Sequence, residues 1–190
     1  MDTRERILEV ARARFLADGI DGVSMRKIAR EVRVSATAIY RHFDHKDELL
    51  DALTNEGFDT LETYLRQTPR DAPALQVIRG LLDQLVKFAD DHPNDYDFIF
   101  IIRRKNVRRF PDDFAQRRSV TFNLLLEQVR RGMEAAELEA DDALEASLSI
   151  WAHVHGLVAL RRAGRFGGSA ESFRKLCRRS LERLFSGMCT

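Results

Sequence analysis

The stretch from Ser35 to Phe43 combines hydrogen-bond donors with a complete lack of acidic residues. Its side chains that can donate hydrogen bonds include Thr37, Tyr40, Arg41 and His42. Ala36 and Ala38 lie among them and are small enough to let a helix approach base edges or thymine methyl groups. This combination predicts a helix that enters the major groove of double-stranded DNA.

Residues on either side of this stretch are suited to contact DNA phosphates. Ser24 and Arg26 stand at the start of an earlier predicted helix, and Lys46 opens a later one, where backbone N–H groups lack partners. Such contacts position a protein on the duplex, whereas base-edge contacts specify sequence. The alternative is that Tyr40 and Lys46 are ordinary surface residues of a helical bundle. The candidate DNA-binding residues are Ser24, Arg26, Ser35, Ala36, Thr37, Tyr40, Arg41, His42 and Lys46.

Short helices must hold these side chains in place. Apolar residues recur at helical spacing over residues 2–16, and Asp18-Gly19 supplies a stop. Ser24 and Ser35 are natural N-caps of two short helices, over about 24–32 and 36–43, which form a helix-turn-helix. Asp44 is expected to cap a fourth helix that continues to Thr68-Pro69.

The rest of the chain predicts further helices. They cover approximately residues 73–91, 94–104, 111–131, 141–163 and 170–186. Only four prolines and ten glycines occur in 190 residues, so helix propensity dominates. We therefore expect an all-α protein of about nine helices. A three-helix DNA-binding domain over residues 1–46 is expected to precede a larger helical domain over 47–190 that binds an effector and dimerises.

Composition narrows the function classes. The 31 Lys and Arg against 30 Asp and Glu give a net charge of +1, which does not by itself indicate a nucleic-acid-binding protein. The argument for DNA binding therefore depends on the local placement of basic residues. No apolar run approaches the roughly 20 residues that cross a bilayer, which favours a cytoplasmic protein without a membrane partner. Cys177 and Cys189 lack metal-ligand or redox spacing, and no nucleophile or glycine-rich phosphate motif appears. We expect no metal, no cofactor and no enzyme activity.

The segment 141–163 is apolar on more than one side, which predicts that it packs against both the core and a second copy of the chain. The last helix, 170–186, has a broad apolar stripe of its own. Two such helices per chain could form a four-helix bundle in a homodimer. The candidate dimer-interface residues are Ile150, Val154, Leu157, Leu181 and Leu184.

Aromatic residues of the C-terminal part could line a mostly apolar pocket for a small apolar or amphipathic effector. The candidate ligand-binding residues are Phe98, Phe114, Phe122, Trp151 and His155. His155 follows Trp151 by one helical turn and could supply a polar group, although a hydrogen-bonded core histidine fits equally well. The basic run 103–109 could steer an anionic ligand, touch DNA or form a solvated loop.

The N-terminal quarter resembles the tetracycline-repressor (TetR) family of bacterial regulators. The resemblance rests on Phe15, Gly19, Val23-Ser24, Ile28-Ala29, Val34-Ser35, Ile39-Tyr40, Phe43, Lys46 and Leu49-Leu50. The segment from Trp151 to Leu157 is similar to a Trp/His-Gly signature in the ligand-binding domain of one branch of that family. The resemblance implies a homodimeric repressor that an effector releases from a palindromic operator. Two alternatives are a helical ligand-binding or catalytic protein whose N-terminal motif is only structural, and a DNA-binding regulator without an effector.

Two positions depart from the family pattern. Arg33 stands in the turn where glycine is usual, and if that position requires positive φ, arginine costs about 1 kcal/mol relative to glycine. His45 stands before Lys46, where serine often caps the following helix. Asp44 is expected to replace that cap.

Overall fold

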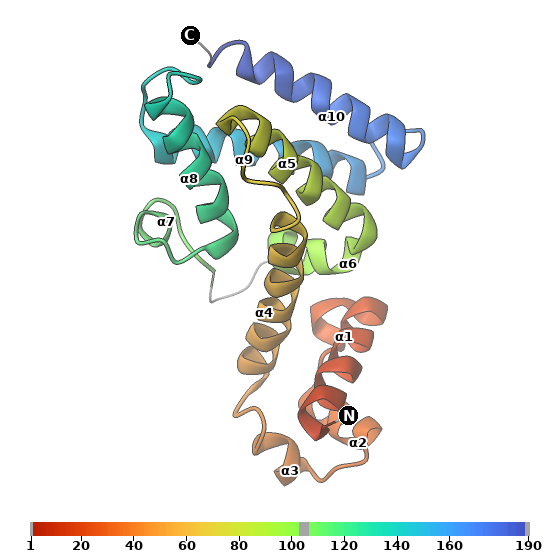
Figure 1. Cartoon of the computed structure of the whole chain (residues 1–190). Coiled ribbons are helices and arrows are strands. Elements are labelled where there is room, and N and C mark those ends of the chain that lie inside the picture. The colour runs from red at the N-terminus through yellow and green to blue at the C-terminus, as the bar shows by residue number, and fades with distance from the viewer. Residues whose placement is uncertain (1, 103–106, 189–190) are drawn as a thin grey trace. The chain divides into compact units, whose positions relative to one another are not determined.

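The computed structural model describes residues 2–102 and 107–188, apart from the side chains of residues 20 and 21. Every regular element in these ranges is a helix, which confirms the all-α prediction. The chain divides into two compact units, each visible in Figure 1. Unit 1 runs from the N-terminus to Phe58 and includes the segment that starts at Asp97, and unit 2 contains Asp59–Tyr96 and the chain from Val107 onward.

Unit 1 contains the predicted helix-turn-helix. Its elements are α1 (Thr3–Gly22), α2 (Met25–Val32), α3 (Ala36–Tyr40), the start of α4 (Lys46–Leu65) and the π-helical turn η1 (Asp97–Ile101). The predicted stop at Gly19 appears as a kink, with φ 69° and ψ −164°, inside α1. The apolar stripes meet in a core in which Ile7, Ile28 and Ile39 are fully buried.

Two arginines of α1 hold the helix-turn-helix in place beside this core. The Arg6 guanidinium donates to the Val32 carbonyl, at the end of α2, over 2.6 Å. The Arg4 guanidinium lies over the Phe43 ring, 5.1 Å from its centroid, just beyond α3. Cations near the last carbonyls of a helix and over an aromatic face are both favourable placements. The start of α1 is thereby joined to both helices of the motif.

The turn between α2 and α3 requires a left-handed residue, and Arg33 provides it. Arg33 has φ 61° and ψ 44°, and its N–H donates to the Arg30 carbonyl at 3.2 Å. The next amide, that of Val34, reaches back to the Ala29 carbonyl at 2.9 Å. These paired bonds close the helix end in the way that glycine usually permits. The chain therefore forms the usual turn with an unfavourable residue.

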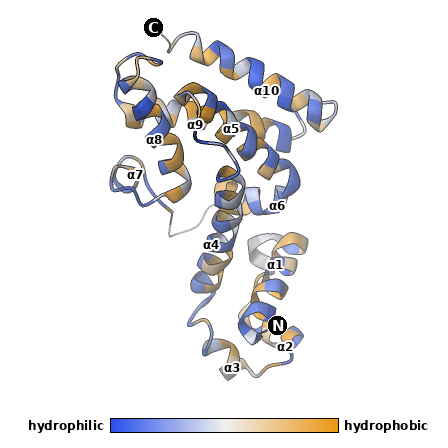
Figure 2. Ribbon diagram, viewed as in Figure 1, coloured by the Kyte–Doolittle hydropathy of each residue, from blue (hydrophilic) through white to orange (hydrophobic). Residues whose placement is uncertain are grey.

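Unit 2 is a helical bundle around α5. It contains the end of α4, α5 (Ala74–Asp91), α6 (Pro93–Tyr96), α7 (Asp112–Ala115), α8 (Val120–Glu134), α9 (Ala143–Arg162) and α10 (Ala170–Phe185). α5 packs against α8, α9 and α10. α10 carries alternating hydrophobic and hydrophilic residues (Figure 2), and buries Phe173, Cys177, Leu181 and Phe185.

A distant carboxylate caps α5. Pro73 precedes the helix and offers no side-chain cap. Glu137, from the segment after α8, accepts from the Ala74 and Leu75 N–H groups, each at 2.9 Å. These backbone bonds, that of Leu75 above all, lower the pKa of Glu137. A cap from another part of the chain ties the two segments together as well as satisfying the helix start.

Two predicted helices are interrupted. The segment predicted over 94–104 coincides with most of α6 and with η1, which belong to different units, and its last two residues lie outside the described residues. The segment predicted over 111–131 contains α7 and α8, separated by Arg117 with φ 57° and by Ser119. Of the five helices predicted after residue 70, the other three agree with α5, α9 and α10 to within two residues at each end.

Replacing Arg33 by glycine should stabilise unit 1. The substitution removes the free-energy cost of holding a non-glycine residue in the left-handed conformation. This gain exceeds the cost of glycine's extra backbone entropy in the unfolded chain by roughly 0.5–1 kcal/mol. Urea unfolding followed by circular dichroism measures the difference. Arg33→Ala is the matched control, since it removes the side chain but keeps the penalty. Equal free energies of unfolding for the glycine and alanine variants would show that the left-handed penalty does not exceed the backbone entropy that glycine adds to the unfolded chain.

Candidate DNA-binding face and effector site

The predicted recognition residues lie on the solvent side of α3. Ser35 caps this helix, because its hydroxyl accepts the Ala38 N–H at 3.0 Å. Ile39 is fully buried, whereas Thr37 and Tyr40 are exposed, with Tyr40 45% accessible. Ala36 and Arg41 are exposed as well, and His42 is half-buried. One buried side chain therefore orients a short helix whose polar residues point outward.

The start of α2 also presents groups to solvent. Ser24 occupies the N-cap position with extended backbone, and its side chain makes no capping bond. Arg26, two residues further on, is exposed. Both side chains are suited to contact phosphate from the open end of α2.

The cap of α4 differs from the prediction. The acceptor is not Asp44 but His45, whose Nδ1 accepts the Glu48 N–H at 3.0 Å. The Glu48 carboxylate in turn accepts the Asp44 N–H at 2.6 Å. This is a reciprocal arrangement of the capping-box kind, with an imidazole in the place of a hydroxyl. Asp44 contributes its backbone rather than its carboxylate, and Lys46 begins the helix.

Acidic groups of unit 1 are engaged with neighbours of their own. Glu31 accepts two bonds from the Arg14 guanidinium, at 2.8 and 2.7 Å, and Glu56 pairs with Arg12 at 2.7 Å. These pairs are partly exposed and each contributes little to stability. They do offset negative charge that would otherwise repel an approaching phosphate backbone.

In unit 2 a row of rings connects four of the five predicted effector-site residues. Ring centroids lie 4.9 Å apart for Phe114–Phe122, 5.9 Å for Phe122–Trp151 and 4.8 Å for Trp151–His155. The fifth, Phe98, belongs to unit 1, where its ring packs edge-on against Phe15 at 4.5 Å. Aromatic spacing in the sequence could not show that η1 places Phe98 in the other unit.

The row ends at Tyr96, which is not among the five predicted ligand-binding residues. Tyr96 is fully buried, its ring stacks on His155, and its hydroxyl lies 2.6 Å from His155 Nδ1. Desolvation lowers the pKa of His155 to about 3, so the imidazole is neutral at pH 7. A neutral pair of hydroxyl and imidazole among apolar rings can exchange hydrogen bonds with a ligand but cannot balance a ligand's charge.

Three predicted dimer residues lie in the core of a single chain, which corrects the predicted interface. Ile150 and Val154 are fully buried and Leu181 is 3% exposed. They cannot cover a partner, because α9 and α10 use these faces against their own unit. Leu157 and Leu184 are half-buried and Leu160 is 48% exposed. Apolar periodicity identified α9 as covered on two sides without showing which side is internal.

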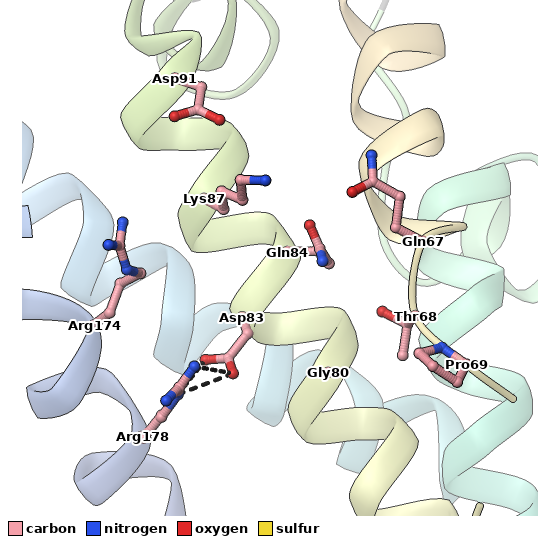
Figure 3. A pocket seen from close by; sticks show the side chains of 10 residues that line it. All are labelled: Gln67, Thr68, Pro69, Gly80, Asp83, Gln84, Lys87, Asp91, Arg174 and Arg178. Carbon is pink, nitrogen blue, oxygen red and sulfur yellow. Dashed lines mark hydrogen bonds and ion pairs between the residues drawn. The ribbon is translucent and has the colours of Figure 1, made fainter. Parts of the chain in front are cut away.

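A polar groove of about 550 Å³ lies on unit 2 between α5, α10 and the segment after α4 (Figure 3). Its acidic groups and its arginines have partners within the chain. Asp83 accepts from Arg178 at 2.9 and 3.0 Å, Arg174 reaches Asp90 at 3.3 Å, and Asp91 accepts from the Tyr64 hydroxyl at 2.9 Å. None of the predicted effector residues lines this groove, and its ion pairs orient α10 on α5.

Comparison with known proteins decides the family. A profile described as "Tetracyclin repressor-like, C-terminal domain" matches residues 78–184, more than half of the chain. A second, described as "Bacterial regulatory proteins, tetR family", matches residues 7–53, which include α2 and α3. The chain belongs to the tetracycline repressor family. The resemblance seen in the N-terminal quarter is thereby confirmed, and the match extends through α10.

Individual relatives share parts of this chain or its fold. The HTH-type transcriptional regulator SAR2658 of Staphylococcus aureus (strain MRSA252) is 32% identical over 92 residues, covering 48% of this chain and 50% of that protein. The chain thus matches about half the length of that curated relative. A solved protein of unknown function from Rhodococcus sp. RHA1 has a TM-score of 0.80 at 24% identity, covering 100% and 97% of the two chains. AibR, solved with isovaleryl coenzyme A and operator DNA, has a TM-score of 0.67 at 19% identity, covering 92% and 95%.

Acid should destabilise this protein partly through His155. Its pKa of about 3 in the folded chain lies below the ordinary value of 6.5, so the unfolded chain binds one more proton between these values. Stability is therefore retained above pH 6.5 and lost progressively as the pH falls toward 3. Urea unfolding between pH 7 and 5 should show a shallower decline for His155→Gln than for the parent, with His153→Gln as the control for loss of a histidine from α9. Identical slopes for all three proteins would contradict burial of a neutral His155.

Proposed function

We propose that this protein is a sequence-specific DNA-binding transcriptional repressor that acts as a homodimer and leaves a palindromic operator when it binds a small apolar or amphipathic effector. The observation that carries the proposal is the exposed side of α3, where Thr37, Tyr40 and Arg41 stand on a helix fixed from behind by buried Ile39. A helix of this kind, free of acidic side chains, suits a major groove.

Candidate phosphate-binding groups on both sides of α3 support the proposal. Arg26 near the start of α2 and Lys46 at the start of α4 flank the recognition helix in the sequence, and both helix starts have N–H groups suited to anions. Tyr40 adds an exposed hydroxyl. Contacts of this type would fix the register of the protein on DNA and leave base preference to α3.

The outer face of α9 supports dimerisation. By length and composition α9 could cross a membrane, but this is weak support for a membrane role because core helices of other proteins pass the same test. Only 28% of its most apolar window is buried within one chain. Ala152, Gly156 and Leu160 lie on the exposed side, and the first two would let a second helix approach closely. A second copy seated on this face and on Leu184 of α10 would cover it.

The aromatic row supports an effector with an apolar body and one hydrogen-bonding group. Trp151 and Phe114 are only partly buried and offer apolar contact area, while the neutral Tyr96–His155 pair offers polar atoms. AibR was solved with an acyl thioester, isovaleryl coenzyme A, and with operator DNA. By analogy, we propose that the effector of this protein also combines an apolar part with a polar group.

α4 is the element that could couple the two activities. Its first residue, Lys46, lies in unit 1, and its buried residues Leu61 and Leu65 lie in unit 2. A ligand that favours one packing of unit 2 would then change the spacing of two DNA-binding modules in the dimer. Effector binding would weaken operator binding because the two ligands favour different spacings of the DNA-binding modules.

An effector screen coupled to DNA binding tests this function. The protein should bind specifically to the DNA upstream of its own gene. A compound that changes the fluorescence of Trp151, the single tryptophan, should weaken that DNA binding over the same concentration range. Saturating operator should weaken binding of the compound by the same factor, because linkage is reciprocal. Trp151→Phe should keep DNA binding and lose the fluorescence change.

The possible failures separate the alternatives. Specific DNA binding with no compound that affects it would leave a regulator without an effector. Compound binding without any specific DNA binding would instead indicate a helical ligand-binding protein whose N-terminal motif is structural.

A further inference from the structure

We propose that the polar groove on unit 2 is a second small-molecule site, and that it binds a small hydroxylated acid such as a sugar acid or a sugar phosphate. The groove lies between α5, α10 and the segment after α4, and its volume of about 550 Å³ falls in the range of ligand pockets. None of the five predicted effector-site residues lines it. The inference therefore goes beyond the proposed function and does not depend on DNA binding.

Two polar groups of the groove are buried without partners. Thr68 is 6% exposed, and its hydroxyl oxygen forms no hydrogen bond with any residue that the structure describes. The same holds for the amide oxygen Oε1 of Gln84, on the facing helix α5. Buried polar groups are nearly always hydrogen-bonded, because leaving one unpartnered costs free energy. Either a ligand hydroxyl or an ordered water can supply the missing bonds, and the charges of the groove favour the ligand.

The position of Thr68 depends on a glycine of α5. A Cβ atom at Gly80 would lie 2.6 Å from Thr68 Cγ2, so a larger residue there would push Thr68 away from the helix. Glycine in a helix interior lowers helix stability, and a buried hydroxyl without a partner lowers stability as well. The chain thus carries two unfavourable choices at one place. Such local exceptions in an otherwise consistent fold are expected at functional sites.

The charge of the groove that lacks an opposite partner is positive. Three cations and two carboxylates line the groove. Lys87 of α5 forms no ion pair with any described residue, and its ammonium lies 5.6 Å from the centroid of the Tyr64 ring. Figure 3 shows the Lys87 side chain directed from α5 toward the segment after α4. This ammonium can therefore bind a carboxylate or a phosphate without giving up an ion pair to a described residue.

The remaining groups suit hydroxyl groups of the same ligand. The Arg174 guanidinium makes one hydrogen bond to a described residue, from Nη1 to Asp90 at 3.3 Å, which leaves other N–H groups to donate. The Gln67 and Gln84 amides can each donate and accept, and the Thr68 hydroxyl can do both as well. A ligand with one acidic group and several hydroxyls would match the ammonium and these neutral groups together.

Calorimetric titration of the whole protein tests the site with four probes. Gluconate and glucose 6-phosphate carry both an acidic group and hydroxyls, whereas glucose lacks the acidic group and acetate lacks the hydroxyls. At least one of the two hydroxylated acids should bind saturably below about 10 mM and raise the midpoint of thermal unfolding. Glucose and acetate should bind at least about tenfold more weakly, because each lacks one part of the match.

Two substitutions locate the bound acid. Lys87→Gln should weaken its binding about tenfold, and Lys175→Gln, at an exposed position of α10 outside the groove, is the matched control. Thr68→Val should weaken binding about fivefold and should also raise the thermal stability of the free protein, because it removes a buried hydroxyl without a partner. Thr63→Val, at an exposed position of α4, should leave the affinity unchanged.

The inference fails if neither hydroxylated acid binds up to about 10 mM, or if glucose binds as tightly as the acids do. Parental affinity of both Lys87→Gln and Thr68→Val would place the bound acid elsewhere. A more stable Thr68→Val protein without any binding of acid by the parent would assign the buried hydroxyl to an ordered water. None of these failures would affect the proposed DNA binding, which depends on residues of α2, α3 and the start of α4.

Discussion

The candidate DNA-binding surface of this protein depends on the burial of a very short helix. α3 contains five residues, which is far below the length at which an isolated helix is stable in water. Its position is set by Ile39, which is fully buried, and by Phe43, which is 1% exposed just beyond it. The exposed donors of α3 have a defined direction only while these two side chains stay in the core of unit 1.

The neighbouring contacts of unit 1 serve this constraint. Arg4 covers the Phe43 ring, and Arg6 holds the last turn of α2 through the Val32 carbonyl. The left-handed Arg33 then turns the chain from α2 toward α3, and the His45 cap starts α4 after it. Local strain at Arg33 is tolerated because burial on both sides of the turn over-determines its conformation. The direction of the exposed α3 side chains is therefore set by core packing and helix capping.

Much of this arrangement could be predicted from local sequence. Serine before an apolar stripe predicted the starts of α2 and α3. Arg33 stands where the family usually has glycine, and this predicted the positive φ at that position. The break between α6 and η1 could not be predicted, because that segment carries no glycine. The break around Arg117 had one signal, Ser119 at the N-cap position of α8, which helical periodicity across the segment concealed. The cap of α4 was misassigned for a related reason: Asp is the commoner capping residue, and only the fold shows that the imidazole of His45 lies nearer to the helix start.

The candidate effector site was predictable in part. Periodicity placed Trp151 and His155 one turn apart, and the structure joins them to Phe114 and Phe122 through ring contacts. It could not place Phe98 in unit 1, nor show that Tyr96 pairs with His155. These depend on contacts between segments far apart in sequence. The same is true of Ile150, Val154 and Leu181, whose burial within one chain could not be separated from burial against a partner.

Methylation protection of the bound operator tests most directly whether α3 enters the major groove. Guanine N7 is reached by dimethyl sulfate from the major groove, whereas adenine N3 is reached from the minor groove. Bound protein should protect guanine N7 in two segments about 10 base pairs apart, one for each copy of α3. Unchanged guanine N7 reactivity across a fragment that the protein specifically binds, with protection confined to adenine N3, would contradict the account.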